Sequence, residues 1–196
     1  MAKYEYREIT AELSHSFPNG WHTPAWRQVR LLSDHPVGCG PTAWGIVYGY
    51  WSAFNGKANL FDGYDVADNY NTTPPRSSVV AEAMGEISKD TKTNYGGEIM
   101  NQRFGLTWPK NMCRGIRYAR RKGYSGAKCS RVRGREFSKF RTISSSIKAD
   151  MPVILLIKDS DRRGVPNHYV VIEKAVLRDG AIINPPILLA LLLLLM

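Results

Sequence analysis

The chain has 196 residues, of which 43% are hydrophobic and 11% aromatic, a globular composition that excludes intrinsic disorder. Its formal charge of +10 makes attraction to nucleic acid or another anionic surface a hypothesis to weigh. Three cysteines are too few for a disulfide framework, and the chain lacks a C-x-x-C pair or the His/Cys spacing of a zinc site. We therefore expect one domain with no metal or organic cofactor, in a reducing compartment or with one reactive thiol.

Residues 1–34 have the composition of an irregular, aromatic-rich lead-in, with turns at 18–20 and 23–24. Because the first residues contain no apolar core, we expect neither a signal peptide nor a membrane anchor there. This indicates a cytoplasmic protein, or one exported by a route that the sequence does not show.

Four helices are predicted where apolar residues recur at intervals of three and four. They cover about 41–54, 77–87, 109–122 and 136–148. Residues 55–76 are rich in Asn, Asp, Gly and Pro, which predicts a long surface loop because short polar side chains compete with regular backbone hydrogen bonding.

Two short runs rich in β-branched residues, 152–159 and 168–176, predict neighbouring strands, and a turn at 178–181 precedes a further short run. Helices come first and strands last, without an internal repeat, so the fold class is α+β. We expect a single domain over 1–196, with a mainly helical lobe at 1–150 and a β lobe at 151–196.

The C-terminal segment "PPILLALLLLLM" carries no charge. From Ile187 onward it is about half as long as the ~20 residues that span a bilayer as a helix. A buried strand or helix, a truncated membrane segment and a damaged C-terminus all remain open, and so does a membrane contact.

Cys39 lies at the predicted start of the first helix, in the sequence "GCGPTAW". Unpaired N–H groups and the helix dipole at such a position stabilise a thiolate and lower the thiol pKa from its free value of about 8.5. A nucleophilic thiol also needs a base. His168 opens a predicted strand directly after a loop and is the candidate, whereas His35 lies in a Pro-bounded turn and is assigned no role.

Three segments between residues 24 and 176 carry a resemblance to a known family: "PAWRQ", "GCGPTAWGIVYGYW" and "PVILLIKD" with the later "NHYVVIEKA". They resemble bacterial papain-like cysteine peptidases of the double-glycine-peptidase-like and streptopain-like kinds. The resemblance implies that Cys39 is the nucleophile, His168 the base, Gln28 an oxyanion donor and Asn184 the residue that orients the imidazole. It also implies that the helical lobe, with the Cys helix, packs on a C-terminal antiparallel sheet.

Two of these assignments depart from the family pattern. The glutamine commonly stands closer to the cysteine, where this chain has Ser33, and the "W-x-Q" context of Gln28 resembles the streptopain variant. A two-residue hairpin at 179–180 would place Asn184 opposite Ala175, far from His168. Either the turn falls earlier in the chain or another residue orients the imidazole.

The predicted function is hydrolysis of a peptide or isopeptide bond in a peptide or protein substrate, by a monomer. Thiol, His and Asn groups also serve amidase, deamidase and acyl-transfer chemistry, and the apolar tail leaves open an incomplete, catalytically impaired site.

A different class of function is suggested by the basic segment 117–135, whose cations are interleaved with tyrosines as in nucleic-acid or anionic-surface binders. No nucleic-acid motif is present, so we do not expect nucleic acid as a partner. Cys113 and Cys129 are predicted to be inert, and could be bridged only if their Cα atoms came within about 7 Å.

Overall fold

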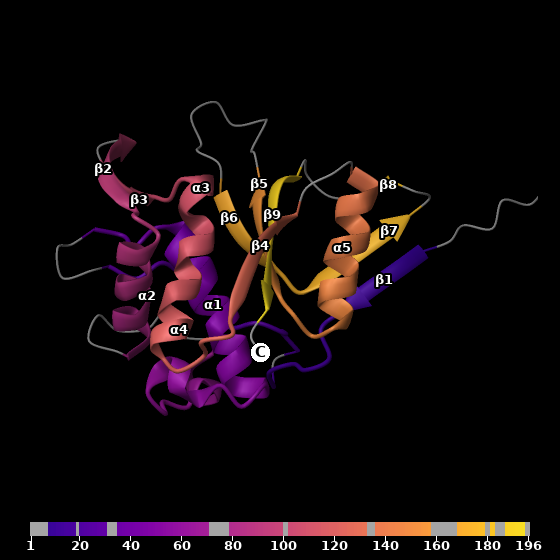
Figure 1. Ribbon diagram of the computed structural model, residues 1–196, viewed down its shortest axis with the longest axis horizontal. Helices are drawn as coiled ribbons and strands as arrows, with labels where there is room; N and C mark the ends of the chain where they lie inside the picture. Colours follow the sequence, from indigo (N-terminus) through magenta and orange to yellow (C-terminus); the bar gives the residue numbers. More distant parts are fainter. Residues whose placement is uncertain are drawn as a thin grey trace, which may run out of the picture.

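The fold is taken from a computed structural model, whose described residues are 8–18, 20–30, 35–70, 79–99, 102–132, 136–157, 168–178, 181–182 and 187–194. Figure 1 shows helices gathered on one side of a central sheet, with α5 and a second sheet on the other side. The α+β class predicted from the sequence is confirmed.

Each of the four segments predicted to be helical contains a helix. They are α1 (Cys39–Phe54), α2 (Val79–Asp90), the series α3 (Pro109–Met112), η3 (Cys113–Gly115) and α4 (Ile116–Arg121), and α5 (Glu136–Lys148). The third helix is thus interrupted by a 3₁₀ turn at η3. Helix α1 is buried on most of its surface and its aromatic side chains, among them Trp44, Tyr48 and Trp51, form the centre of the core.

The segment predicted as a long surface loop, 55–76, contributes to the core instead. It contains two 3₁₀ helices, η1 (Ala58–Phe61) and η2 (Val66–Asn69), and buries Leu60, Phe61 and Val66. The Tyr118 hydroxyl donates to the Leu60 carbonyl at 2.5 Å. The prediction failed because a few apolar residues within a polar segment are enough to fold it against the helices.

Three antiparallel sheets are present among the described residues. The largest has the order β4 (Lys128–Val132), β9 (Ile187–Leu194), β5 (Val153–Ile157) and β6 (His168–Ile172). The second has the order β1 (Glu8–Glu12), β7 (Lys174–Arg178) and β8 (Ala181–Ile182), and the third pairs β2 (Asn94–Ile99) with β3 (Gln102–Leu106). The predicted pairing of the strands at 152–159 and 168–176 is confirmed, with Ile157 opposite His168.

The run 168–176 serves two sheets rather than one. It bends at Glu173, so that β6 belongs to the large sheet and β7 to the sheet that includes β1. Strands far apart in the sequence therefore lie side by side, as β1 and β7 do in Figure 1.

Five strands were not predicted outright from the sequence: β1 in the lead-in that was expected to be irregular, β2 and β3 between the second and third predicted helices, β4, and β9 in the tail. β4 lies at the end of the basic segment 117–135, and the leucine-rich tail forms β9 between β4 and β5, with Leu191 opposite both Arg131 and Ile154. The tail is therefore a strand and not a helix over Ile187–Leu194. Within the described part of the chain, no helix is long and apolar enough to cross a membrane.

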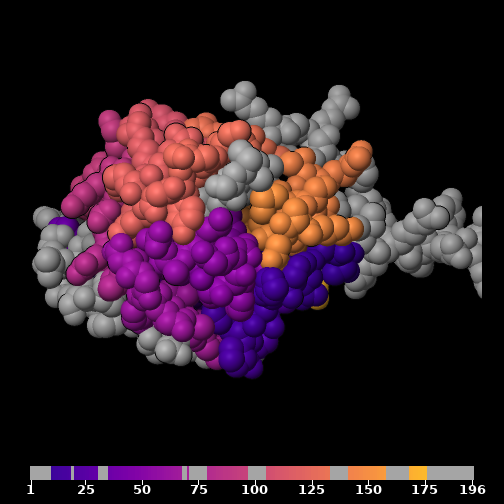
Figure 2. Space-filling view, turned by 60° about the horizontal axis from the view of Figure 1, so that its bottom comes forward, coloured from indigo at the N-terminus to yellow at the C-terminus, as the bar shows by residue number. Residues whose placement is uncertain are grey.

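The lead-in before α1 is held by Asp150, which follows α5. The Asp150 carboxylate accepts from the Ser14 N–H at 2.8 Å and from the Tyr50 hydroxyl at 2.5 Å, and lies 3.4 Å from His15 Nε2. Figure 2 shows the N-terminal segment, in indigo, packed next to orange residues from the C-terminal half of the chain. One carboxylate thus joins the lead-in, α1 and the turn before β5.

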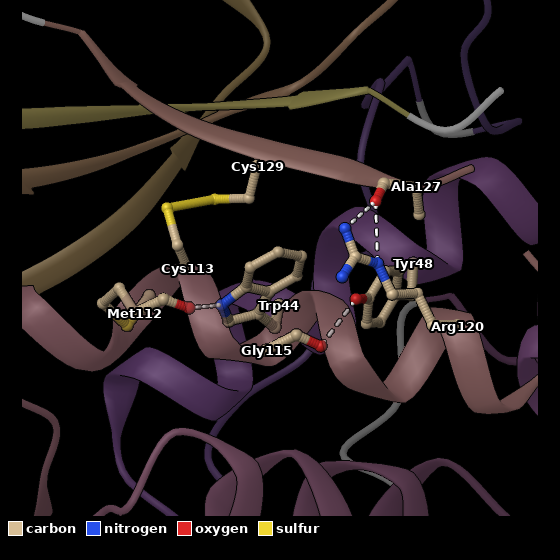
Figure 3. The surroundings of a disulfide bond; sticks show 8 residues. All are labelled: Trp44, Tyr48, Met112, Cys113, Gly115, Arg120, Ala127 and Cys129. Atoms are coloured by element: carbon tan, nitrogen blue, oxygen red, sulfur yellow. Dashed lines mark hydrogen bonds between the residues drawn. A yellow bond between two sulfur atoms is a disulfide. The ribbon is translucent and has the colours of Figure 1, made fainter. Parts of the chain in front are cut away.

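Cys113 and Cys129 form a disulfide, with 5.4 Å between their Cα atoms, which joins η3 to β4 (Figure 3). The sequence analysis gave these two cysteines no role but allowed a bridge if their Cα atoms came within about 7 Å, and this condition is met because β4 returns beside η3. Around the bond, Trp44 Nε1 donates to the Met112 carbonyl at 2.9 Å, which ties α1 to the same region.

Reduction of this disulfide is predicted to lower the free energy of unfolding by about 3 kcal/mol, the value for a loop of about this length. The measurement is urea unfolding with and without a phosphine reductant, in a Cys39→Ala background that prevents exchange with the third thiol. A Cys113→Ser/Cys129→Ser variant should show the lower stability in both conditions. An unchanged midpoint on reduction of the parent would contradict the prediction.

Candidate active site

Cys39 is the first residue of α1, and the residue before it fixes its position. Gly38 has φ 93° and ψ 153°, a conformation that side chains disfavour, and a Cβ there would collide with the backbone of Gly105 in β3. The Thr42 hydroxyl donates to the Gly38 carbonyl at 2.8 Å and closes the first turn. The thiol is therefore carried on a turn that has little freedom to move.

The strand β6 lies against this helix start. His168 is the first residue of β6, and the backbone N–H of the next residue, Tyr169, is directed at the Cys39 sulfur. This contact brings a strand more than 120 residues later in the chain next to the thiol.

A cavity of about 390 Å³ opens between the helix start and β6. It is lined by Trp26, Arg27, Gln28, Cys39, Thr42, Ala43, Ile46, His168, Tyr169, Val170 and Val171. Three of the four residues selected from the sequence, Gln28, Cys39 and His168, thus line one cavity although they come from three separate segments.

Gln28 reaches the cavity because its segment folds back beside the residues before α1. The Val37 N–H donates to the Val29 carbonyl at 2.9 Å, and Arg30 pairs with Pro36 in an antiparallel bridge. Residues 31–34 lie outside the described residues. The longer spacing between the glutamine and the cysteine is therefore compatible with both side chains lining the cavity.

Asn184 lies outside the described residues. In the register of β7 and β8, Arg178 lies opposite Ala181. Strands β7 and β8 also belong to a different sheet from β6. Within the described ranges, no side chain hydrogen-bonds the His168 ring.

Burial is the main cause of the pKa shifts of the Cys39 thiol and the His168 imidazole. It raises the pKa of the Cys39 thiol above its ordinary value, and the N–H groups of Tyr169, Cys39 and Gly40 offset only part of this effect. Burial also lowers the pKa of His168. The expectation of a thiol pKa lowered by the helix start is therefore wrong in this structure, and the two shifts favour the neutral form of each group at pH 7.

Tyr169 is a cavity residue that the sequence analysis did not select. Its side chain is 4% exposed, and its hydroxyl has no hydrogen-bond partner among the described residues. Burial is the main cause that raises its pKa, followed by the proximity of Cys39. No pattern in the sequence pointed to it, since successive side chains of a strand point to opposite faces and its place next to His168 does not by itself bring it to the site.

No group of three His, Cys, Asp or Glu side chains within the described ranges is arranged to hold a metal ion. Comparison with family models, with curated proteins and with solved structures finds no match to this chain. The site is therefore interpreted from its own geometry.

Replacement of Gly38 by Ala is predicted to destabilise the protein through both backbone strain and the collision with Gly105. Gly20 is the matched control, because it also has a positive φ, 79°, but has open space around the position of a Cβ. Gly38→Ala should therefore lower the free energy of unfolding by at least about 2 kcal/mol more than Gly20→Ala, as judged by urea unfolding. If the two substitutions lower the free energy of unfolding equally, the close approach of Gly38 to Gly105 does not contribute to the cost.

The raised pKa of Cys39 predicts that its thiolate forms only above the ordinary titration range of a thiol, about 8.5. The measurement is the ultraviolet absorbance of the thiolate against pH, taken as the difference between the parent and Cys39→Ala. Little thiolate should be present at pH 7. Full thiolate absorbance at neutral pH would instead indicate a stable thiolate–imidazolium pair.

Proposed function

We propose that this protein is a thiol hydrolase of papain-like arrangement that cleaves a peptide or isopeptide bond. The observation that carries the proposal is the cavity that Gln28, Cys39 and His168 line together. The packing of the Cys39 helix start against the His168 strand also supports it, because this is the arrangement of lobes that the family resemblance implies.

In the proposed reaction the Cys39 sulfur attacks the substrate carbonyl while His168 takes the thiol proton. The new C–S bond forms, the C–N bond breaks, and the imidazolium returns the proton to the leaving amine. Water, deprotonated by His168, then attacks the thioester, releases the carboxylic acid and restores the thiol. Atoms and charge balance without a metal or an organic cofactor.

The lowered pKa of His168 suits the first of these steps. A neutral imidazole can accept a proton, whereas an imidazolium cannot, and burial keeps the ring neutral at pH 7. The proton would therefore move as the sulfur attacks, rather than before the substrate binds.

Donors for the oxyanion are available at the same place. The Cys39 N–H belongs to the unpaired first turn of α1, where the helix dipole favours negative charge, and Gln28 lines the cavity beside it. Such donors are worth most where charge appears in the transition state. Amidase or acyl-transfer chemistry would use the same residues and differ only in the leaving or accepting group.

The alternative function, binding of nucleic acid or another anionic surface, has less support. Three cations at the end of α4 are bound within the chain: Arg120 to the Ala127 carbonyl, Arg121 to Asp90 at 2.8 Å, and Lys122 to Asp62 at 2.7 Å. Part of the basic segment therefore joins α4 to β4, α2 and η1 instead of forming a free cationic face.

The test is alkylation of the non-reduced protein by iodoacetamide at neutral pH, followed by mass spectrometry. Because Cys113 and Cys129 are bonded, one label on Cys39 is expected per chain. His168→Ala should slow this labelling about 100-fold or more if the imidazole is the base. A library of fluorogenic peptides should lose hydrolysis in Cys39→Ala and His168→Ala.

His35→Ala is the matched control, since His35 is four residues before Cys39 but its ring stacks on Tyr95, outside the cavity. It should label at the parental rate. Equal rates for His168→Ala and the parent would remove His168 from the mechanism and would overturn the proposal.

A further inference from the structure

Glu173 stands at the bend between β6 and β7, and it is bound to the lead-in at two places. Its carbonyl accepts from the Leu13 N–H at 3.0 Å. Its carboxylate accepts from the Thr23 N–H at 2.9 Å and from the Thr23 hydroxyl at 3.0 Å, both at the Oε2 atom. One residue in the run that begins with His168 therefore holds both ends of the segment 13–23.

The lead-in side of these contacts is buried. Leu13 is 3% exposed and Thr23 is 8% exposed. A buried donor that lacks an acceptor is costly, and a hydrogen bond to a carboxylate is stronger than one between neutral groups. The two donors of Thr23 therefore fix the lead-in at the place that the Glu173 carboxylate sets.

The residues that follow Thr23 are bound to the helical side of the molecule. Trp26 is buried, and its ring meets the ring of Phe61 in η1 edge-on, with 5.7 Å between the centroids. The lead-in thus crosses from Glu173 to the helical side between Thr23 and Trp26. Gln28 comes directly after this crossing.

The position of Gln28 depends on the backbone of the lead-in. Gln28 lines the cavity but is exposed, and its side chain has no hydrogen-bond partner in the described part of the chain. By contrast, β6 is paired with β5 along its whole length, His168–Ile172. Loss of the Glu173 contacts would therefore displace Gln28 and leave His168 in place.

We propose that Glu173 is a positioning residue of this site, which sets the place of the oxyanion donor Gln28 relative to the strand that carries His168. The proposal rests on the proposed thiol hydrolase function. Glu173 is not among the residues that line the cavity, so it acts through Thr23 and the backbone that follows. Small displacements matter, because a donor stabilises an oxyanion only when its N–H reaches the oxygen on which the charge develops.

The test uses two small reagents, only one of which forms an oxyanion. With p-nitrophenyl acetate, the Cys39 sulfur attacks the acetyl carbonyl and the thiol proton passes to His168. The C–S bond forms, the C–O bond breaks, and nitrophenolate leaves with the electron pair. Iodoacetamide is attacked by direct displacement of iodide. Both products at Cys39 are measured by mass spectrometry on the non-reduced full chain, with Cys39→Ala as the background.

Glu173→Ala should be acetylated about tenfold more slowly than the parent and alkylated at the parental rate. In a Gln28→Ala background, where acetylation is already slow, Glu173→Ala should cause no further slowing. A purely structural role would not couple the two residues in this way. Equal slowing in both backgrounds would overturn the proposal, and so would equal slowing of both reagents or unchanged acetylation.

Glu173→Gln is the conservative variant, since its amide oxygen can accept both bonds from Thr23, and it should restore acetylation. Glu12 is the matched control. Its carboxylate also contacts the lead-in, at His22 Nε2 at 3.0 Å, and Lys174 at 3.2 Å, but it does not bind Thr23. Glu12→Ala should react with both reagents like the parent.

Thr23→Val removes part of the same contact from the lead-in side and leaves β6 unaltered, so it does not depend on the folding of a Glu173 variant. It loses the hydroxyl donor and keeps the N–H and the branched shape of the side chain. Acetylation should slow about threefold, and only where Gln28 is present. Unchanged acetylation in Thr23→Val would contradict the positioning role.

The two proposals fail in different ways. If alkylation of Cys39 does not depend on His168, the hydrolase function fails, whatever the acetylation rates show. If alkylation depends on His168 but the effect of Glu173→Ala on acetylation does not depend on Gln28, only the positioning proposal fails.

Discussion

The close approach of Gly38 to Gly105 is the constraint on which the rest of the site depends. Only two residues without side chains allow the backbone before α1 to lie against β3 at this distance. The approach fixes the direction in which α1 begins, and through it the place of Cys39 relative to β6. The aromatic core around Trp44 and Tyr48 then holds the helix in that direction, since both side chains donate to carbonyls of the α3–η3 region.

Burial has two opposite effects at this site. It lowers the effective dielectric constant around the thiol and so strengthens any interaction with a charge that develops there during reaction. It also opposes the charged forms of the thiol and of the imidazole before reaction. The start of a helix is therefore not enough to predict a thiolate, because the depth at which the helix begins decides whether its N–H groups outweigh desolvation.

The sequence predicted the helices and the pair β5 and β6 because these elements have regular apolar patterns. It did not predict β1, β2, β3 or β4, which have few apolar residues, or β9, whose uniform leucines carry no period. The disulfide was missed for the same reason, since it depends on where β4 returns. Cys39 and His168 were selected by their positions at element starts, whereas the place of Tyr169 in the cavity depends on how β6 packs against α1, which no local pattern shows.

The position of β9 has a consequence for how the chain folds. β9 fills the gap between β4 and β5, two strands that end at least 30 residues before β9 begins. During synthesis β4, β5 and β6 emerge from the ribosome first, so the edges that β9 will cover are exposed for some time. Contacts of such long sequence separation form slowly. The order of synthesis therefore leaves the strand that carries His168 on an incomplete sheet, open to pairing with other chains, until β9 arrives.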